Sequence, residues 1–226
     1  MEESVTIFLD ESYGPSKTAL TMVCAVVFAE LELSEKSLAM RYKQLAVEPH
    51  RWDSTKKFLR FRKDGFHYTT DTDQVRDLFL DDAAHLDFRA HLAYSANPFN
   101  LSNTDLLINL YRAILVPIFS RYSKCSVTLV FEQEQQMDSH YQALVDDIRG
   151  EFEREKRALP DVSVLRGTKR APLLAISDYV MGVAASTVAA QPHNYHQVRL
   201  LGMARYIAHV LNLDSQEHSR RGKIYS

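Results

Sequence analysis

The chain alternates between short apolar runs typical of strands and longer segments in which apolar residues recur at helical spacing. Residues 5–12 read VTIFLDES, and residues 18–29 are almost continuously apolar. Val, Ile and Phe favour a buried, pleated strand. A Gly-Pro turn separates the two runs, which predicts an antiparallel hairpin. The first of these strands ends in two adjacent carboxylates, Asp10 and Glu11.

The remaining pattern predicts strands and helices in alternation. Helices are predicted over residues 33–46, 71–84, 103–122, 138–158, 172–190 and 197–211. Further strands are predicted over residues 86–96, 125–132 and 161–166. The first of these alternates apolar and polar positions, which indicates one wet face near a sheet edge. We therefore expect one α/β domain over residues 1–226, with a mixed five-stranded sheet and helices on both faces.

Residues 49–70 interrupt this pattern as a basic and aromatic insertion without a clear periodicity. One interpretation is a solvated connector. The other is a segment whose aromatic side chains stack on bases and whose cations contact phosphates. The candidate cations are Lys56, Lys57, Arg60 and Arg62, with Lys169 and Arg170 in a later loop that is equally consistent with a solvated turn.

Composition narrows the functional class. The formal net charge of −2 argues against a dedicated electrostatic nucleic-acid binder and leaves room for a local basic groove. Cys24 and Cys125 both lie in apolar runs, without a CxxC pair or a secretory signal. We therefore expect free thiols in a cytoplasmic protein. No apolar stretch is long enough to cross a membrane, so we expect no membrane association.

Carboxylates recur in apolar settings at three places in the chain. Asp10 and Glu132 end strands, and Asp178 lies in the apolar helix predicted over residues 172–190. A buried, unpaired carboxylate costs several kcal/mol, and protonation, a cation partner or a metal removes this cost. Turn residues and a hydrogen-bonded core aspartate are the alternative interpretations. Neighbouring strand residues point to opposite faces, so Asp10 and Glu11 should not be equal ligands, and Asp10 is preferred.

Three carboxylates that converge at adjacent strand ends would form a site for hard divalent cations. Mg²⁺ and Mn²⁺ prefer oxygen ligands and retain bound water. Two such ions about 4 Å apart can stabilise the attacking and the leaving oxygen in phosphodiester hydrolysis. The chain contains no GxSxG, HExxH or GxxxxGK motif that would favour another chemistry. We expect Asp10, Glu132 and Asp178 to lie within reach of one metal.

Four short motifs, taken in order, resemble those of the domain-of-unknown-function family numbered 3800. They are FLDES at residues 8–12, FHYTTD at 66–71, VFEQ at 130–133 and ISDYVMG at 176–182. The series covers nearly the whole chain, and each motif alone is short. Tyr13 stands where the family has glycine, and Glu132 stands where it more often has Asp.

The resemblance implies a ribonuclease H-like fold and a metal-dependent nuclease. Asp10, Glu132 and Asp178 match its acidic positions and would hold Mg²⁺ or Mn²⁺, with Glu11 and His67 assisting catalysis. The substrate would be DNA or RNA, and the protein could act as a homodimer or in a larger complex of defence or mobile-element biology. Two alternatives stay open: a catalytically weak or inactive module that binds nucleic acid or protein, and a phosphatase or nucleotide hydrolase.

Overall fold

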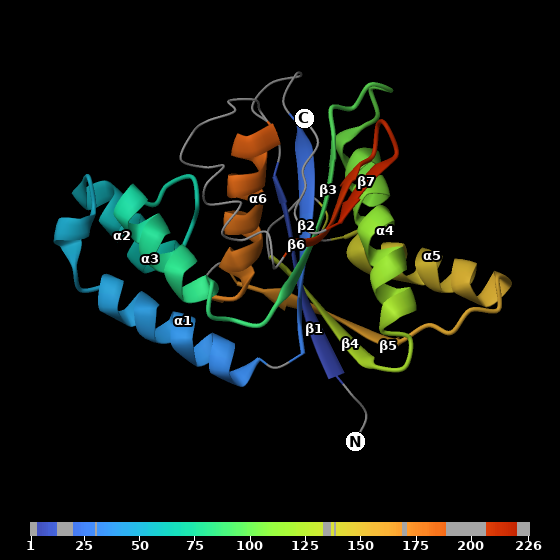
Figure 1. The fold of residues 1–226 in the computed structure, drawn as a ribbon, viewed down its shortest axis with the longest axis horizontal. Helices are drawn as coiled ribbons and strands as arrows, with labels where there is room; N and C mark the ends of the chain where they lie inside the picture. Colours follow the sequence, from blue (N-terminus) through green and yellow to red (C-terminus); the bar gives the residue numbers. More distant parts are fainter. Residues whose placement is uncertain are drawn as a thin grey trace.

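The structure, a computed structural model, describes residues 4–12, 20–29, 31–132, 137, 139–168, 171–188 and 207–220. At its centre is a seven-stranded sheet (Figure 1). The strands are β1 (Ser4–Ser12), β2 (Thr21–Phe28), β3 (Arg89–Ser95), β4 (Ser126–Glu132), β5 (Asp161–Gly167), β6 (Ile207–Asn212) and β7 (Glu217–Arg220). They are arranged in the order β5-β4-β1-β2-β3-β6-β7.

Strand directions show how this sheet is built. The first three strands form an antiparallel meander, in which β2 pairs with both β1 and β3. Strand β4 then pairs in parallel with β1, and β5 pairs in parallel with β4. The order β3-β2-β1-β4-β5 with these directions is a ribonuclease H-like arrangement. The predicted α/β fold with a mixed sheet is therefore confirmed.

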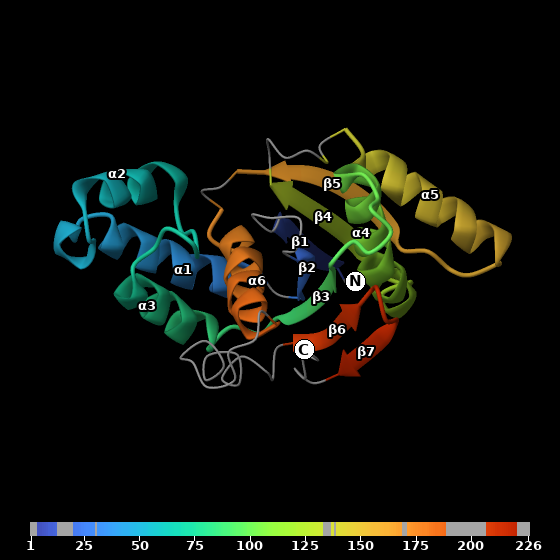
Figure 2. The same ribbon diagram turned by 90° about the horizontal axis from the view of Figure 1, so that it is seen from above.

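Helices cover both faces of the sheet (Figures 1 and 2). They are α1 (Glu32–Leu45), α2 (Thr55–Asp64), α3 (Asp73–Ala83), α4 (Asn103–Arg121), α5 (Tyr141–Arg154) and α6 (Leu174–Val188), together with the short 3-10 helix η1 (Pro49–Arg51). Helices α4 and α5 pack on one face, and α6 packs on the other, where α1, α2 and α3 extend outward beyond it. None of the described helices is both long enough and apolar enough to cross a membrane.

The side chains of β1 alternate between two separate hydrophobic cores, one on each face of the sheet. Ile7 and Leu9 pack with α4 and α5, whereas Phe8 packs with α6. Because neighbouring residues of a strand point to opposite faces, a strand that is apolar throughout can only be buried on both sides. This explains why the opening run of the chain becomes a central strand.

The prediction of five strands was wrong, because a hairpin of β6 and β7 extends the sheet beyond β3. Residues 207–211 fall in β6, although a helix was predicted over 197–211. Ile207, Val210 and Leu211 are buried and lie at helical spacing, so periodicity favoured the wrong element. The turn after β6 carried the missed signal, because the side chain of Asn212 accepts hydrogen bonds from the amides of Asp214 and Ser215.

The position predicted for β3, at an edge with one wet face, was also wrong. The strand lies between β2 and β6, and all its residues after Arg89 are buried. Among them is His91, which is only 8% exposed and has no hydrogen-bond partner at either ring nitrogen within the described structure. Its ring centroid lies 6.3 Å from that of His209 on the neighbouring strand.

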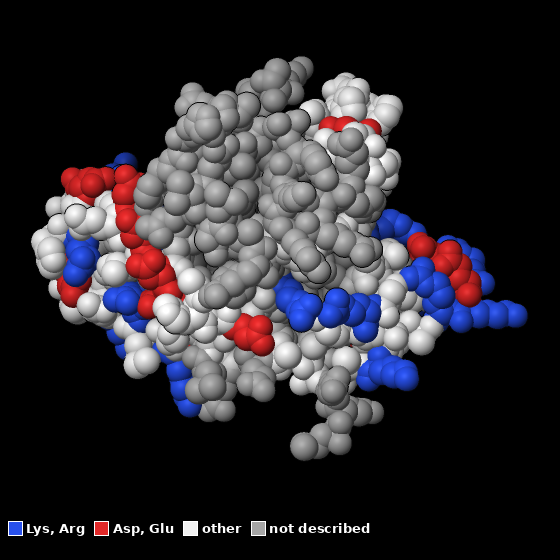
Figure 3. Space-filling model, viewed as in Figure 1, with Lys and Arg blue, Asp and Glu red and all other residues white. Residues whose placement is uncertain are grey.

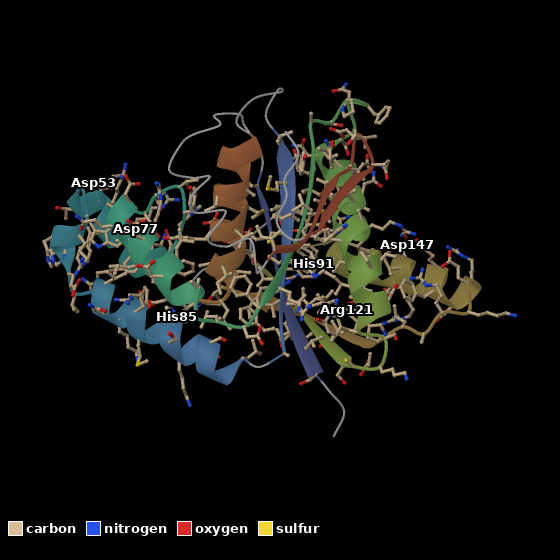
Figure 4. All side chains as sticks on the ribbon, viewed as in Figure 1. Asp53, Asp77, His85, His91, Arg121 and Asp147 are labelled. Atoms are coloured by element: carbon tan, nitrogen blue, oxygen red, sulfur yellow. The ribbon has the colours of Figure 1, made fainter. Side chains whose placement is uncertain are left out.

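Burial lowers the pKa of His91 to about 4, and positive charge from His209, Arg121 and Arg89 acts in the same direction. Figure 4 shows His91 on β3 and Arg121 near the end of α4. An imidazole in this setting stays neutral in the folded protein, while the unfolded chain takes up a proton near pH 6.5. Stability should therefore fall as the pH drops from about 6.5 towards 4.

We expect His91→Leu to reduce this loss of stability at acidic pH. Between pH 8 and pH 5 the free energy of unfolding should fall by about 2 kcal/mol less in the variant than in the wild type. Urea unfolding at both pH values measures the difference. His85→Gln is the matched control, since His85 is exposed on the surface; equal pH dependence in wild type and His91→Leu would contradict the prediction.

Candidate functional site

Asp10 and Glu132 lie at the ends of two neighbouring parallel strands. Leu9 of β1 lies opposite Phe131 of β4, so Asp10 and Glu132 are the next residues along the two strands. Two residues earlier, Phe8 and Val130 both pack against the core under α6. By strand alternation, both carboxylates face the α6 side of the sheet, and Asp10 is only 6% exposed there.

Glu11 faces the opposite side of the sheet, as the alternation along β1 predicted. Its Oε2 atom accepts hydrogen bonds from the hydroxyls of Tyr111 at 2.5 Å and Tyr141 at 3.3 Å. These tyrosines belong to α4 and α5. The carboxylate of Glu11 therefore lies on the other side of the sheet from that of Asp10. Its hydrogen bonds connect β1 to α4 and α5.

Helix α6 brings Asp178 to the side of the sheet that Asp10 faces. The hydroxyl of Ser177 donates a hydrogen bond of 3.3 Å to the carbonyl oxygen of Phe8, which fixes α6 on β1. The Oδ2 atom of Asp178 accepts a hydrogen bond of 2.8 Å from the amide of Tyr68. The same oxygen lies 2.8 Å from Nδ1 of His67. Within the described residues, its Oδ1 atom accepts no hydrogen bond.

The turn over residues 67–71 is fixed by a second buried acid, Asp71. Its Oδ2 atom accepts hydrogen bonds from the amide of His67 at 2.9 Å and from the hydroxyl of Tyr179 at 2.6 Å. Tyr179 follows Asp178 in α6, so the helix holds the turn at two points. Asp71 closes the FHYTTD motif, and its role in fixing His67 was not predicted.

Hydrogen bonding and burial shift the pKa values of His67 and Asp71. The hydrogen bond to Asp178 raises the pKa of His67, while burial and the positive charge of Arg60 act in the opposite direction. Burial raises the pKa of Asp71 to about 6. The hydrogen bond to Asp178 therefore favours the protonated form of His67.

The basic segment of the insertion forms α2 and packs its aromatic rings inward. Trp52 and Phe61 are buried, with ring centroids 4.5 Å apart, so their rings face the interior and not an open stacking surface. Lys57 pairs with Asp53 at 2.7 Å, and Arg60 pairs with Asp64 at 3.8 Å.

The remaining predicted cations are less constrained by the structure. The guanidinium of Arg62 lies 5.8 Å from the centroid of the Phe58 ring, and Lys56 lies on the same helix. Lys169 and Arg170 lie outside the described residues. In Figure 3, acidic and basic side chains are interspersed over the described surface of the lobe formed by α1, α2 and α3.

The described residues do not form a complete metal site. Among them, no group of three or more His, Cys, Asp or Glu side chains is arranged to hold a metal ion. The structure brings Asp10 and Glu132 together and places Asp178 on the same side of the sheet, but it does not gather all three within the reach of one ion. The oxygen donors fit Mg²⁺ or Mn²⁺ by chemistry, and Asp178 is held instead by His67 and Tyr68.

No family model matches the sequence, and no curated protein matches it. Among solved structures, a chain of the complex of PCNA and RNase HII from Archaeoglobus fulgidus is similar to this chain. The two share 11% identity over 81% of this chain and 73% of that chain, with a TM-score of 0.48. Membership of the family numbered 3800 remains a resemblance of motifs, and the ribonuclease H-like fold follows from strand order and direction.

Gly182 allows the turn to pack against α6. A Cβ atom at this position would lie 2.1 Å from Cδ1 of the Tyr68 ring. We expect Gly182→Ala to displace Tyr68, to lower the free energy of unfolding by about 1–3 kcal/mol, and to shift the NMR resonances of His67. Urea unfolding and histidine-selective NMR measure the two effects.

Gly150→Ala is the matched control for this substitution. Gly150 lies within α5, and no heavy atom lies within 4 Å of a Cβ built there. Alanine should raise stability at this position by up to about 1 kcal/mol, because it favours the helix more than glycine does. Equal stability of the two variants would show that the ring of Tyr68 moves away without cost.

Proposed function

We propose that the protein is a metal-dependent nuclease that hydrolyses phosphodiester bonds in DNA or RNA. One observation carries this proposal: Asp10 and Glu132 end neighbouring parallel strands on the face that α6 covers. Carboxylates placed side by side in this way are the ligands that Mg²⁺ and Mn²⁺ prefer. The position of Asp178 on the same side supplies a third carboxylate for the site.

Asp10 and Glu132 would hold the divalent ions, with Oδ1 of Asp178 as a further oxygen donor. When bound, such ions supply a nucleophilic water and stabilise charge on the phosphate. His67 keeps its Nδ1 atom on Asp178, so Nε2 is the atom that can donate a proton to the leaving oxygen or contact a phosphate. Glu11 supports the site from the other face by fixing β1.

Helix α2 is the proposed contact for the nucleic-acid backbone. The charge of Arg60 acts on the pKa of His67, which indicates that this end of the helix faces the turn. Lys56 lies one helical turn before Arg60 and shares its side of the helix. These cations, with Arg62, would bind phosphates and position the strand, whereas Lys57 is already paired with Asp53.

A second candidate function is a nucleic-acid- or protein-binding module with a weak or inactive metal site. This alternative is favoured because, among the described residues, no group of three or more His, Cys, Asp or Glu side chains is arranged to hold a metal ion. A homodimer, a larger complex and a cytoplasmic location stay predictions for either function.

We expect Asp10→Asn to reduce cleavage of labelled single-stranded DNA and RNA in Mn²⁺ by at least about 100-fold, since the charge that holds the ion is lost. Gel electrophoresis of the products measures the rate. Asp161→Asn, which removes an exposed carboxylate at the start of β5, is the control and should cleave like the wild type. Equal cleavage by Asp10→Asn would contradict the proposal.

Calorimetric titration with Mn²⁺ separates the two candidate functions. The nuclease should bind Mn²⁺, and both Asp10→Asn and Asp178→Asn should weaken this binding. The binding module should take up no Mn²⁺ at millimolar concentration and should still retain labelled nucleic acid in a gel-shift assay.

A further inference from the structure

A polar cavity of about 300 Å³ lies between the insertion and the start of α3. Its lining includes Arg51, Trp52, Lys57, Asp71, Asp73 and Arg76. This volume is at the small end of the range of small-molecule sites, which is roughly 300–1,000 Å³. The cavity therefore suits one ring-sized ligand and not an extended one.

Two residues of this lining bury polar atoms that have no hydrogen-bond partner among the described residues. Within the described structure, Nε1 of Trp52 donates no hydrogen bond and Oδ1 of Asp71 accepts none, although the residues are only 7% and 2% exposed. A buried polar atom without a hydrogen bond destabilises the folded protein. One is a donor and the other an acceptor, so a ligand edge that carries an acceptor beside a donor would satisfy both.

Charge at the cavity favours a neutral ligand. Lys57 pairs with Asp53 at 2.7 Å, and Arg76 pairs with Asp73 at 2.9 Å. Arg51 is likewise paired with Glu48. Because each of these cations already has a carboxylate partner, a free anion gains little there. A polar, uncharged ring gains hydrogen bonds without displacing an ion pair.

We propose that this cavity binds one unpaired nucleobase by an edge that carries a donor beside an acceptor, as guanine and uracil do. In guanine or uracil, Oδ1 of Asp71 would accept a hydrogen bond from the ring N–H, and Nε1 of Trp52 would donate one to the adjacent carbonyl oxygen. Enzymes that take a base out of its stack read it by hydrogen bonds to this edge and by aromatic contact. The choice of a nucleobase rests on the proposed function, because a nucleic-acid substrate brings the base to the protein.

The cavity is connected to the candidate catalytic cluster by one acid. Oδ2 of Asp71 accepts a hydrogen bond from the amide of His67, and Nδ1 of His67 contacts Oδ2 of Asp178. A base bound to Oδ1 would therefore contact the side chain that also fixes His67. The substrate implied by this arrangement is a single-stranded or locally unpaired nucleic acid.

Trp52 is the only tryptophan of the chain, so its fluorescence reports directly on the cavity. Both unpartnered atoms are covered from solvent, and base binding requires a rearrangement at the indole ring. We expect GMP or UMP to change the fluorescence saturably and inorganic phosphate to have no effect. The titrations are made in EDTA, so metal-dependent chemistry does not contribute.

Asp71→Asn tests the acceptor. The amide oxygen can keep the hydrogen bonds from Tyr179 and His67, which places the NH₂ group where Oδ1 was and turns an acceptor into a donor. GMP or UMP should then bind at least about tenfold more weakly. Asp73→Asn removes an exposed carboxylate from the same lining and should bind within about twofold of the wild type.

Three outcomes would overturn the inference: no response to any nucleotide at about 10 mM, an equal response to phosphate alone, or equal binding by Asp71→Asn and wild type. If circular dichroism shows that Asp71→Asn is unfolded, calorimetry on Trp52→Phe replaces it, and unchanged GMP or UMP binding there also overturns the inference. Nucleotide binding without nuclease activity would refute the proposed function alone, and cleavage without nucleotide binding would refute the cavity alone.

Discussion

The alternation of side chains along β1 is the constraint on which the rest of the site depends. Asp10 and Glu11 are adjacent and both are buried, yet they enter different cores. The carboxylate of Glu11 accepts hydrogen bonds from two tyrosine hydroxyls, one on α4 and one on α5. Asp10 faces α6 beside the end of β4. A shift of one residue in the pairing of β1 would exchange the two carboxylates and put each into the wrong environment.

Docking of α6 extends this constraint to a segment far away in sequence. Ser177 ties the helix to β1, and the next two residues hold the turn over residues 67–71. Asp178 accepts a hydrogen bond from the amide of Tyr68, and the hydroxyl of Tyr179 donates one to Asp71. The glycine at position 182 leaves room for the Tyr68 ring. The position of His67 is therefore set by α6 together with Asp71 of its own turn.

Local patterns predicted the strands that build the sheet centre and the separation of Asp10 from Glu11, because period two is a property of neighbouring residues. They failed at β6, where Ile207, Val210 and Leu211 also match helical spacing. They did not predict the contact between Asp178 and Tyr68, whose positions differ by 110 residues. Nor did the aromatic composition of the insertion reveal that Trp52 would be buried, since only packing against other segments decides this.

The hydrogen bonds of Asp178 bear on whether a cation can use this carboxylate. Both the Tyr68 amide and His67 contact Oδ2, so a cation would need only Oδ1. Mg²⁺ commonly binds through single carboxylate oxygens and keeps several waters. Hydrogen bonds to the other oxygen of a ligating carboxylate orient it and raise metal affinity. The contacts of Asp178 are therefore compatible with a carboxylate that is oriented by its Oδ2 atom and binds a cation through Oδ1.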